Sequence, residues 1–160
     1  MSSPAAFAQQ FWAACMAGQY DALAAHFAED ATVETQPPNA FSFIPNLAEG
    51  AVKAQDKLAW WKSVKEAVVK EDKGLELHQS VSTGNTVVTR CTGHVICPDG
   101  KPYAHNFVMF IEFDDAGKVK RAVEFVDTVA VAELFKRAGL SPTTAKKSTV
   151  QAVKEACEVA

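Results

Sequence analysis

The chain has 160 residues, of which 48% are hydrophobic and 22% are charged, and its formal net charge is −3. These values are ordinary for one globular domain with one core, and they exclude the basic surface that nucleic acids or anionic membranes require. The N-terminal residues lack the charged and apolar regions of a secretion signal, and no apolar segment is long enough to span a bilayer. We therefore expect a cytoplasmic protein that binds neither nucleic acid nor membrane.

The N-terminal part of the sequence predicts two helices followed by a short strand. The apolar stripe of the first helix consists of Phe7, Phe11, Ala14 and Gly18, with Trp12 and Cys15 beside it. Asp21 is a candidate N-cap for the second helix, which we expect to bury Leu23 and Phe27. A strand is predicted over residues 31–35, and the two prolines that come after it end it.

A loop and a third helix are predicted next. The loop over residues 37–49 contains the apolar side chains Phe41, Phe43, Ile44 and Leu47. They indicate either a lid or wall of a pocket, or a loop folded onto the core. The apolar stripe of the third helix, which begins after Gly50, consists of Ala54, Leu58, Trp61, Val64 and Val68. We interpret this stripe first as core and second as a ligand contact.

The second half of the sequence alternates apolar and polar residues with a period of two, which predicts strands. Four strands are predicted, over residues 75–82, 86–97, 101–113 and 119–127. A last helix is predicted over residues 129–137, ending at Gly139. Helices followed by a meander of strands predict one α+β domain over residues 1–138. Residues 139–160 are predicted to form a tail with a short helix, which docks on its own domain or on a second subunit.

The turn at Asp99-Gly100 predicts which side chains share a face of the sheet. As a two-residue type I′ turn, it would place Pro98 opposite Lys101. Residues two apart on a strand share a face. One face would then carry Arg90, Thr92, His94, His105, Phe107 and Met109.

The next turn decides the orientation of the last strand. If residues 115–117 form a three-residue loop with a left-handed Gly117, His105 faces Asp127. A shift of one residue would instead direct Glu124 to that face. Asp127 also directly precedes the last predicted helix, so it is a candidate N-cap as well.

Two segments resemble proteins of one superfamily. Residues 27–34, FAEDATVE, resemble the second helix and first strand of bacterial ketosteroid isomerases, and residues 117–128 resemble the last strand of SnoaL-like proteins. Over residues 5–138 the order of elements resembles that of the SnoaL-like and nuclear transport factor 2-like proteins, which include scytalone dehydratase and polyketide cyclases. The resemblance implies a cone-shaped, curved antiparallel sheet (a cystatin-like α+β barrel) with the N-terminal helices packed on its concave face.

The residues that act in ketosteroid isomerase are replaced in this chain. The resemblance puts the oxyanion-hole tyrosine of the isomerase at Phe11, its aspartate base at Thr35, and its second oxyanion-hole donor at Met109. Phenylalanine and methionine donate no proton, and a threonine hydroxyl is too weak a base at neutral pH. Steroid isomerisation by that mechanism is therefore not expected, although apolar residues at 11 and 109 suit an apolar cavity.

The resemblance also implies a site. It makes the face of His105 the concave one, and Asp127 matches the aspartate base at the end of the last strand in SnoaL-like cyclases, whereas the isomerase-like alignment favours Glu124. We expect Asp127, His105 and His94 to be catalytic in proton transfer next to a carbonyl, with Arg90 or a histidine stabilising the resulting oxyanion. The predicted ligand-binding residues are Phe11, Trp12, Trp61, Arg90, Phe107, Met109 and Phe125.

The expected function is that of a cofactor-independent isomerase, cyclase or dehydratase acting on a small apolar carbonyl compound such as a polyketide or terpenoid. No metal is expected: two histidines and a carboxylate can form a facial metal triad, but the sequence has no supporting motif and its four cysteines show no zinc spacing. Two alternatives stay open, a non-catalytic module that binds an apolar small molecule and a protein-interaction module. A homodimer formed through the sheet is expected, as in the proteins that the chain resembles.

Overall fold

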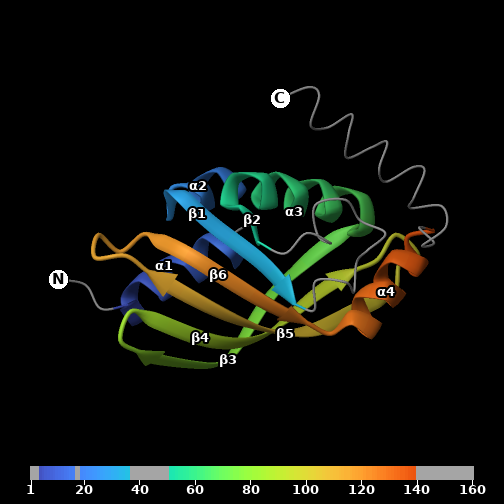
Figure 1. The fold of residues 1–160 in the computed structure, drawn as a ribbon. Helices are drawn as coiled ribbons and strands as arrows, with labels where there is room; N and C mark the ends of the chain where they lie inside the picture. The colour runs from blue at the N-terminus through green and yellow to red at the C-terminus, as the bar shows by residue number, and fades with distance from the viewer. Residues whose placement is uncertain (1–3, 17–18, 37–50, 140–160) are drawn as a thin grey trace.

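The elements of the fold come from a computed structural model that describes residues 4–16, 19–36 and 51–139. In chain order they are α1 (Pro4–Met16), α2 (Tyr20–Ala24), β1 (Phe27–Gln36), β2 (Ala51–Lys53), α3 (Ala54–Val68), β3 (Glu71–Thr83), β4 (Thr86–Ile96), β5 (Pro102–Phe113), β6 (Val119–Val126) and α4 (Thr128–Arg137). The expected α+β class is confirmed (Figure 1). The predicted loop over 37–49 and nearly all of the predicted tail, 140–160, lie outside the described residues.

Six strands form one curved, open sheet in the order β2-β1-β6-β5-β4-β3. All neighbouring strands are antiparallel except β1 and β6, which run parallel. The sheet is therefore mixed. In the chain, α3 separates its first two strands from the meander β3–β6. Among the described helices, none is long and apolar enough to cross a membrane.

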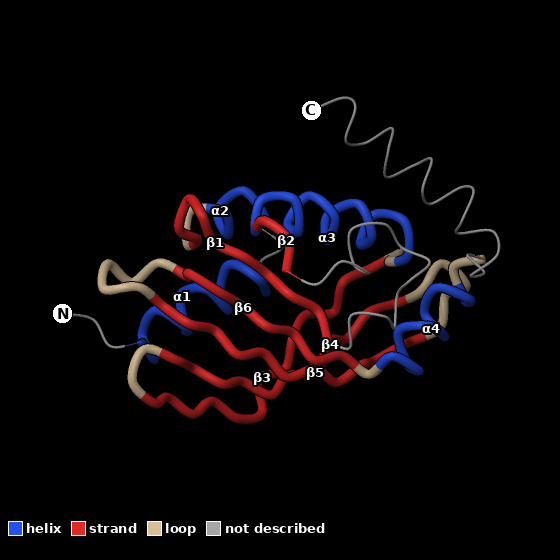
Figure 2. Tube along the Cα trace, in the orientation of Figure 1, coloured by secondary structure: helices blue, strands red, loops and turns tan. Residues whose placement is uncertain are grey.

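The helices α1, α2 and α3 cover one face of the sheet, and α4 lies at the end where β6 finishes (Figures 1 and 2). α1 packs against β3 and β4, whereas α3 packs against β1 and β2. Of the predicted stripe of α1, Phe11 and Ala14 are buried and Phe7 is half-buried against the core, whereas Gly18 lies outside the described residues. The ring of Phe11 is edge-on to those of Trp12 and Phe27, at centroid distances of 5.3 and 5.7 Å. The helices thus close the concave face of the sheet from above.

The second helix differs from its prediction. It ends at Ala24, so that Leu23 is buried in it as expected but Phe27 begins β1 instead. Gln19 occupies the N-cap position and Asp21 lies inside the first turn, so Asp21 is not the cap. A carboxylate in the first turn still interacts favourably with the helix dipole.

The hairpin of β4 and β5 has a different turn from the predicted one. Its loop has three residues, Pro98 to Gly100, closed by the hydrogen bonds Cys97 N to Lys101 O (3.0 Å) and Gly100 N to Cys97 O (2.9 Å). Proline has no N–H with which to close a hairpin pair, and its fixed φ suits the second position of a type I turn. Gly100 supplies the left-handed residue, with φ of 81°.

This extra loop residue shifts the pairing of β4 with β5 by one. His105 lies opposite Gly93, and His94 lies opposite Ala104. The prediction that His94 and His105 face each other is therefore wrong, because a shift of one residue moves a side chain to the other face. Of the six residues predicted to share a face, His105, Phe107 and Met109 are on one face and Arg90, Thr92 and His94 on the other.

The hairpin of β5 and β6 has the predicted three-residue loop, with Gly117 at φ of 79°. Downstream of it, Phe113 pairs with Val119 but Glu112 pairs with Arg121, which leaves Lys120 as an additional residue in β6. Such a bulge reverses the faces of every later residue in the strand. Glu124 consequently points to the concave face, as in the one-residue shift considered from the sequence.

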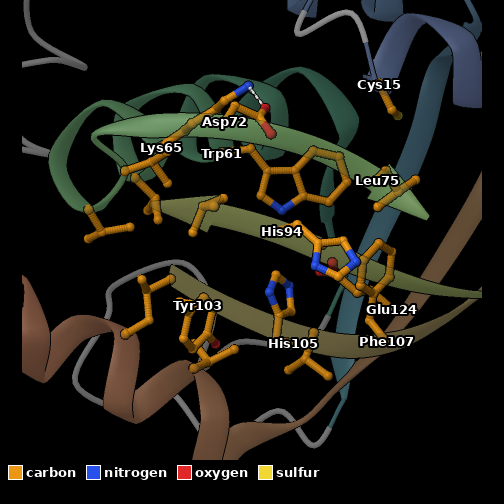
Figure 3. Close-up of a pocket in the computed structure, with 18 of the residues that line it drawn as sticks. Cys15, Trp61, Lys65, Asp72, Leu75, His94, Tyr103, His105, Phe107 and Glu124 are labelled. Carbon is orange, nitrogen blue, oxygen red and sulfur yellow. Dashed lines mark ion pairs between the residues drawn. The ribbon is translucent and has the colours of Figure 1, made fainter. Parts of the chain in front are cut away.

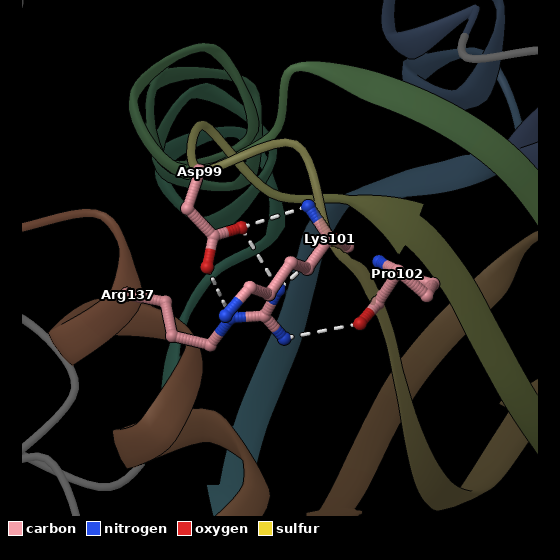
Figure 4. A network of polar contacts seen from close by, with 4 residues as sticks. All are labelled: Asp99, Lys101, Pro102 and Arg137. Carbon is pink, nitrogen blue, oxygen red and sulfur yellow. Dashed lines mark hydrogen bonds and ion pairs between the residues drawn. The ribbon is translucent and has the colours of Figure 1, made fainter.

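The helix α4 is attached to the β4–β5 hairpin by Arg137 (Figure 4). The guanidinium of Arg137 donates from Nε and an Nη to the carboxylate of Asp99, at 3.0 and 2.9 Å, and to the carbonyls of Lys101 and Pro102, at 2.9 and 3.0 Å. The hydrogen bonds from Arg137 lower the pKa of Asp99 to about 2. This bidentate ion pair holds α4 against the β4–β5 hairpin. Residues of α4 line a cavity at this end of the sheet.

Candidate active site

A cavity of about 260 Å³ lies between the helices and the concave face of the sheet. Its walls are mostly apolar and include Trp12, Trp61, Leu75, Phe107, Met109 and Val126. Side chains from α3, α4 and all four strands of the meander point into it, and Figure 3 shows His105, Phe107 and Glu124 on its floor. The space and its lining are typical of a site for a small apolar molecule.

A short chain of polar side chains crosses one wall of this cavity. Thr35 of β1 lies beside Glu124 of β6 in the parallel pair. The Thr35 hydroxyl donates to Glu124 Oε2 at 3.3 Å and accepts from Lys57 Nζ at 2.6 Å. Lys57 comes from the first turns of α3, and its Nζ lies 4.5 Å from the ring centre of Trp60. The hydroxyl therefore links a carboxylate and an amine that belong to different layers of the fold.

Burial shifts the pKa of Glu124 and the pKa of Lys57 away from their ordinary values. Removal from water raises the pKa of Glu124, and the nearby Lys57 and the Thr35 hydroxyl oppose that rise. Burial lowers the pKa of Lys57 to about 8, against the attraction of Glu124, which raises it. Lys57 is only 2% exposed. Each group can thus change protonation closer to neutral pH than it would in water.

Four buried polar atoms, on side chains that line the cavity, have no hydrogen-bond partner among the described residues. They are Nε1 of Trp12, Nε1 of Trp60, the hydroxyl of Tyr103 and Nδ1 of His105. A buried donor without a partner costs stability, about 1–3 kcal/mol for each group. Three of the four are hydrogen-bond donors on side chains that line one cavity, which favours a ligand with acceptor oxygens on an apolar body.

The ring of His105 is held in place on the floor of the cavity by its neighbours. Its ring lies between those of Tyr103 and Phe107, at centroid distances of 5.7 and 5.5 Å. A Cβ on the facing Gly93 would lie 3.0 Å from the imidazole, so glycine leaves the room that the ring occupies. Burial lowers the pKa of His105, with a smaller lowering from His94 and an opposing effect of Asp127. The imidazole is therefore held towards its neutral form.

The predicted ligand-binding residues divide between three places. Trp12, Trp61, Phe107 and Met109 line the cavity. Phe11 packs in the core next to it and does not border the cavity. Arg90 and Phe125 project from the opposite face of the sheet, where Phe125 is 45% exposed, because the registers of β4 and β6 differ by one residue from those predicted. The expected position of Arg90 and Phe125 on the concave face is therefore wrong.

The structure does not bring the predicted catalytic residues Asp127, His105 and His94 together in the cavity. The side chain of Asp127 accepts hydrogen bonds from the backbone N–H groups of Val129 and Ala130, at 3.1 and 3.0 Å, and so caps α4. Within the described part of the chain, no hydrogen bond joins Asp127 to His105, although its charge influences the pKa of that histidine. His94 borders the cavity, but its side chain is 42% exposed and its Nε2 lies 3.3 Å from Glu76 on the outer face. The alternative interpretation of Asp127 as a cap is confirmed.

A comparison with protein-family models gives one match, to the SnoaL-like domain, over residues 8–122. The chain belongs to the SnoaL-like family. A comparison with curated protein sequences gave no significant match. The match runs from within α1 to the first half of β6 and therefore includes Thr35 and Lys57, whereas Glu124 lies two residues beyond it.

Solved structures with the same fold confirm the architecture of this SnoaL-like chain. An NTF2-like protein of unknown function from Burkholderia pseudomallei is 17% identical, with a TM-score of 0.68 over 84% of this chain and 98% of the other. PrhC from Penicillium brasilianum is 18% identical, with a TM-score of 0.72 over 90% and 91%. A putative SnoaL-like polyketide cyclase from Shewanella denitrificans is 16% identical, with a TM-score of 0.63 over 83% and 96%.

Sequence reasoning did not single out Lys57, although a signal was present. Lys57 comes three residues after Ala54 and four before Trp61, inside the apolar stripe of this helix, and a charged residue at such a position is a signal of a buried charge. Thr35 was noted only as the position of the isomerase base. Of the residues in the polar chain of this SnoaL-like domain, Glu124 alone was considered as a catalytic candidate. In the parts of the chain that the structure describes, no three His, Cys, Asp or Glu side chains are grouped so as to hold a metal ion.

Proposed function

We propose that the protein is a cofactor-independent enzyme that transfers a proton next to the carbonyl group of a small apolar compound, with Glu124 as the base. The observation that carries the proposal is the carboxylate of Glu124, which lies in an apolar cavity and is held by Thr35 at 3.3 Å. A positioned carboxylate with a raised pKa is a suitable general base for carbon acids. The SnoaL-like family and its cyclase-type structural neighbours support an activity of this kind.

The surrounding groups give the reaction its electrostatics. Loss of a proton from carbon moves negative charge onto the carbonyl oxygen, and unpaired donors at a fixed position stabilise that charge. Tyr103 offers a hydroxyl and Trp60 an indole N–H, neither of which has a partner among the described residues. Burial raises the pKa of Tyr103, so the phenol keeps its proton and remains a donor. Thr35 and Lys57 orient the base from the other side.

The walls indicate the class of substrate. An apolar body fits the aromatic lining, and the unpaired donors fit one or more acceptor oxygens. Polyketides and terpenoids with ketone or enol groups have this combination. A structural neighbour is named as a putative polyketide cyclase, which is consistent with this class. Isomerisation, cyclisation and dehydration all begin with the proton transfer that we assign to Glu124.

The test is deuterium exchange into 2-tetralone, an apolar ketone, followed by NMR in deuterated buffer. Glu124→Gln should lower the protein-dependent exchange rate about 100-fold or more, since a general base contributes about 10²–10⁴. The matched control is Asp127→Asn, which keeps a side-chain oxygen able to cap α4 and should leave exchange unchanged. Equal exchange by the wild type and Glu124→Gln, or loss of exchange in Asp127→Asn alone, would contradict the assignment.

The second candidate function is a binding module without catalysis. The apolar walls and the unpaired donors favour it equally, because they recognise a ligand whether or not it reacts. The two functions differ in one measurement: a binding module would quench the fluorescence of Trp12 or Trp61 with 2-tetralone while showing no exchange above buffer. That result would support the binding function and reject Glu124 as a base.

We propose in addition that a second copy of the chain covers the outer face of the sheet, giving the homodimer expected from the sequence. Val81, Phe110 and Phe125 are 53%, 41% and 45% exposed on this face, and the two phenylalanine rings are 5.6 Å apart. Sedimentation of the wild type and of Phe110→Asp tests it. A dimeric wild type and a monomeric variant would support the interface, whereas a monomeric wild type at micromolar concentration would refute it.

A further inference from the structure

Lys57 is a reactive group that the proton transfer does not consume. It is almost completely buried, and it is one of the residues that line the cavity. Its hydrogen bond among the described residues is to the hydroxyl of Thr35, at 2.6 Å, and no carboxylate described lies within ion-pairing distance. An ammonium group has three N–H donors. With one acceptor in place, this position suits a neutral amine, which needs fewer partners than the charged form.

We propose that Lys57 is a nucleophile that forms an imine with an aldehyde or ketone group of a ligand in the cavity. The proposal rests on the proposed function for the carbonyl class of the ligand, but it does not require Glu124 to be the base that removes a proton from carbon. It adds a covalent mode of binding to a site that otherwise offers hydrogen bonds and apolar contact.

The step is balanced without any external reagent. The Nζ lone pair forms the N–C bond, the carbonyl π electrons move to oxygen, and one N–H proton moves to that oxygen, giving a carbinolamine. The C–O bond then breaks, and the oxygen leaves as water after taking a second proton, which the carboxyl of Glu124 supplies when protonated. The immediate products are a protonated imine, one water molecule and the carboxylate of Glu124, and return of the remaining N–H proton to that carboxylate gives the neutral imine. Hydrolysis reverses every bond change, so the lysine is regenerated.

The surroundings of Nζ suit the charged form of that product as well. The rings of Trp60 and Trp61 lie 4.5 and 5.7 Å from Nζ. Aromatic faces stabilise a cation at this distance, and a protonated imine carries its charge at the same nitrogen. The positive charge also draws electrons from the adjacent carbon, which acidifies the C–H bond that a base in the cavity would attack.

A second lysine in the cavity provides an internal comparison. Lys65 Nζ is paired with Asp72 at 2.5 Å, and its side chain is 27% exposed (Figure 3). The paired carboxylate holds this lysine as an ammonium ion, which is not a nucleophile. Burial instead lowers the pKa of Lys57 from 10.5 to about 8. At pH 7 the neutral fraction of Lys57 is therefore about 300-fold larger than that of an ordinary lysine.

The experiment is reductive trapping of the full chain with 2-naphthaldehyde and sodium cyanoborohydride, which converts an imine into a stable secondary amine. Intact mass spectrometry counts the naphthylmethyl groups, and peptide mapping locates them. We expect one group, on Lys57, with a labelling rate that rises through about pH 8. Lys57→Arg should abolish the specific label while keeping a positive charge. Lys62→Met, on the exposed side of α3, should retain it.

The outcomes separate this proposal from the previous one. Mapping of the wild type needs no variant, so it decides the proposal even if Lys57→Arg fails to fold. Label spread over surface lysines, label on Lys65 in place of Lys57, or no label on Lys57 between pH 7 and 9 would overturn imine formation. Label on Lys57 without deuterium exchange by Glu124 would refute the base and keep the nucleophile, and exchange without label would do the reverse.

Discussion

Replacing Lys57 with methionine should change the pH dependence of stability, because the lysine is held in an apolar wall at a lowered pKa. The folded value is about 8 and the ordinary value is 10.5. Since one pKa unit corresponds to about 1.4 kcal/mol, the charged form of Lys57 costs about 3 kcal/mol of folding free energy at pH values below 8. This cost decreases between pH 8 and 10.5, where the unfolded chain binds more protons than the folded one, and it is absent above that range.

The assay is urea denaturation of the wild type and Lys57→Met at intervals from pH 7 to 10.5. We expect the unfolding free energy of the wild type, minus that of the variant, to rise by about 3 kcal/mol across pH 8 to 10.5. The subtraction removes the contributions of other groups that titrate in this range, such as Tyr103, because both proteins contain them. Methionine fills similar space, so the apolar wall is kept.

A flat difference over the whole range would refute the reasoning, since it would mean that Lys57 has the same pKa in the folded and unfolded chains. The control is Lys62→Met, which removes an exposed lysine of the same helix. Its difference from the wild type should not vary between pH 8 and 10.5.

Two further predictions concern the turns of the sheet. Gly117→Ala should destabilise the fold by clearly more than Gly100→Ala, for which we expect a loss of about 1 kcal/mol. Both glycines have a positive φ, but only a Cβ at 117 would overlap the ring of Phe7. Equal losses of unfolding free energy in urea would contradict this. Asp99→Asn should lower the melting temperature at pH 7, and the difference from the wild type should vanish as the pH falls from about 4 towards 2. The carboxylate bound by Arg137 has its pKa lowered to about 2, so its stabilisation is lost when it is protonated. A difference that persists at the lowest pH would show that the Arg137 contact does not depend on charge.

The positions of most elements could be predicted from the sequence, because they depend on local periodicity. The strand predicted over 86–97 is β4, Thr86–Ile96, and the last helix begins one residue before its prediction. The faces of the strands could not be predicted in the same way, since they depend on single residues. Pro98 selected a three-residue loop where a two-residue turn was expected, and His94 moved to the outer face as a result.

The candidate site shows the same division between local and long-range information. The aromatic residues Trp12, Trp61 and Phe107 were predicted to line a cavity, and they do. The contact between Lys57 and Thr35 joins a helix to a strand 22 residues away in the chain, and no periodicity within either element specifies it. A lysine in an apolar stripe indicates a buried charge, but its partner is known only once the layers are packed.

The additional residue at Lys120 in β6 links the two surfaces to which we assign different proposed roles. Beyond it, consecutive residues alternate between the cavity, which receives Glu124, and the exposed face, which receives Phe125. Deleting Lys120 would exchange the two sets, placing a phenylalanine in the cavity and a carboxylate among the exposed aromatic rings. Insertions and deletions in this strand are thus constrained by parity: a change of one residue alters both surfaces together, whereas a change of two preserves both. The proposed base and the proposed dimer face would therefore change together in any variant that has one residue more or fewer in this part of β6.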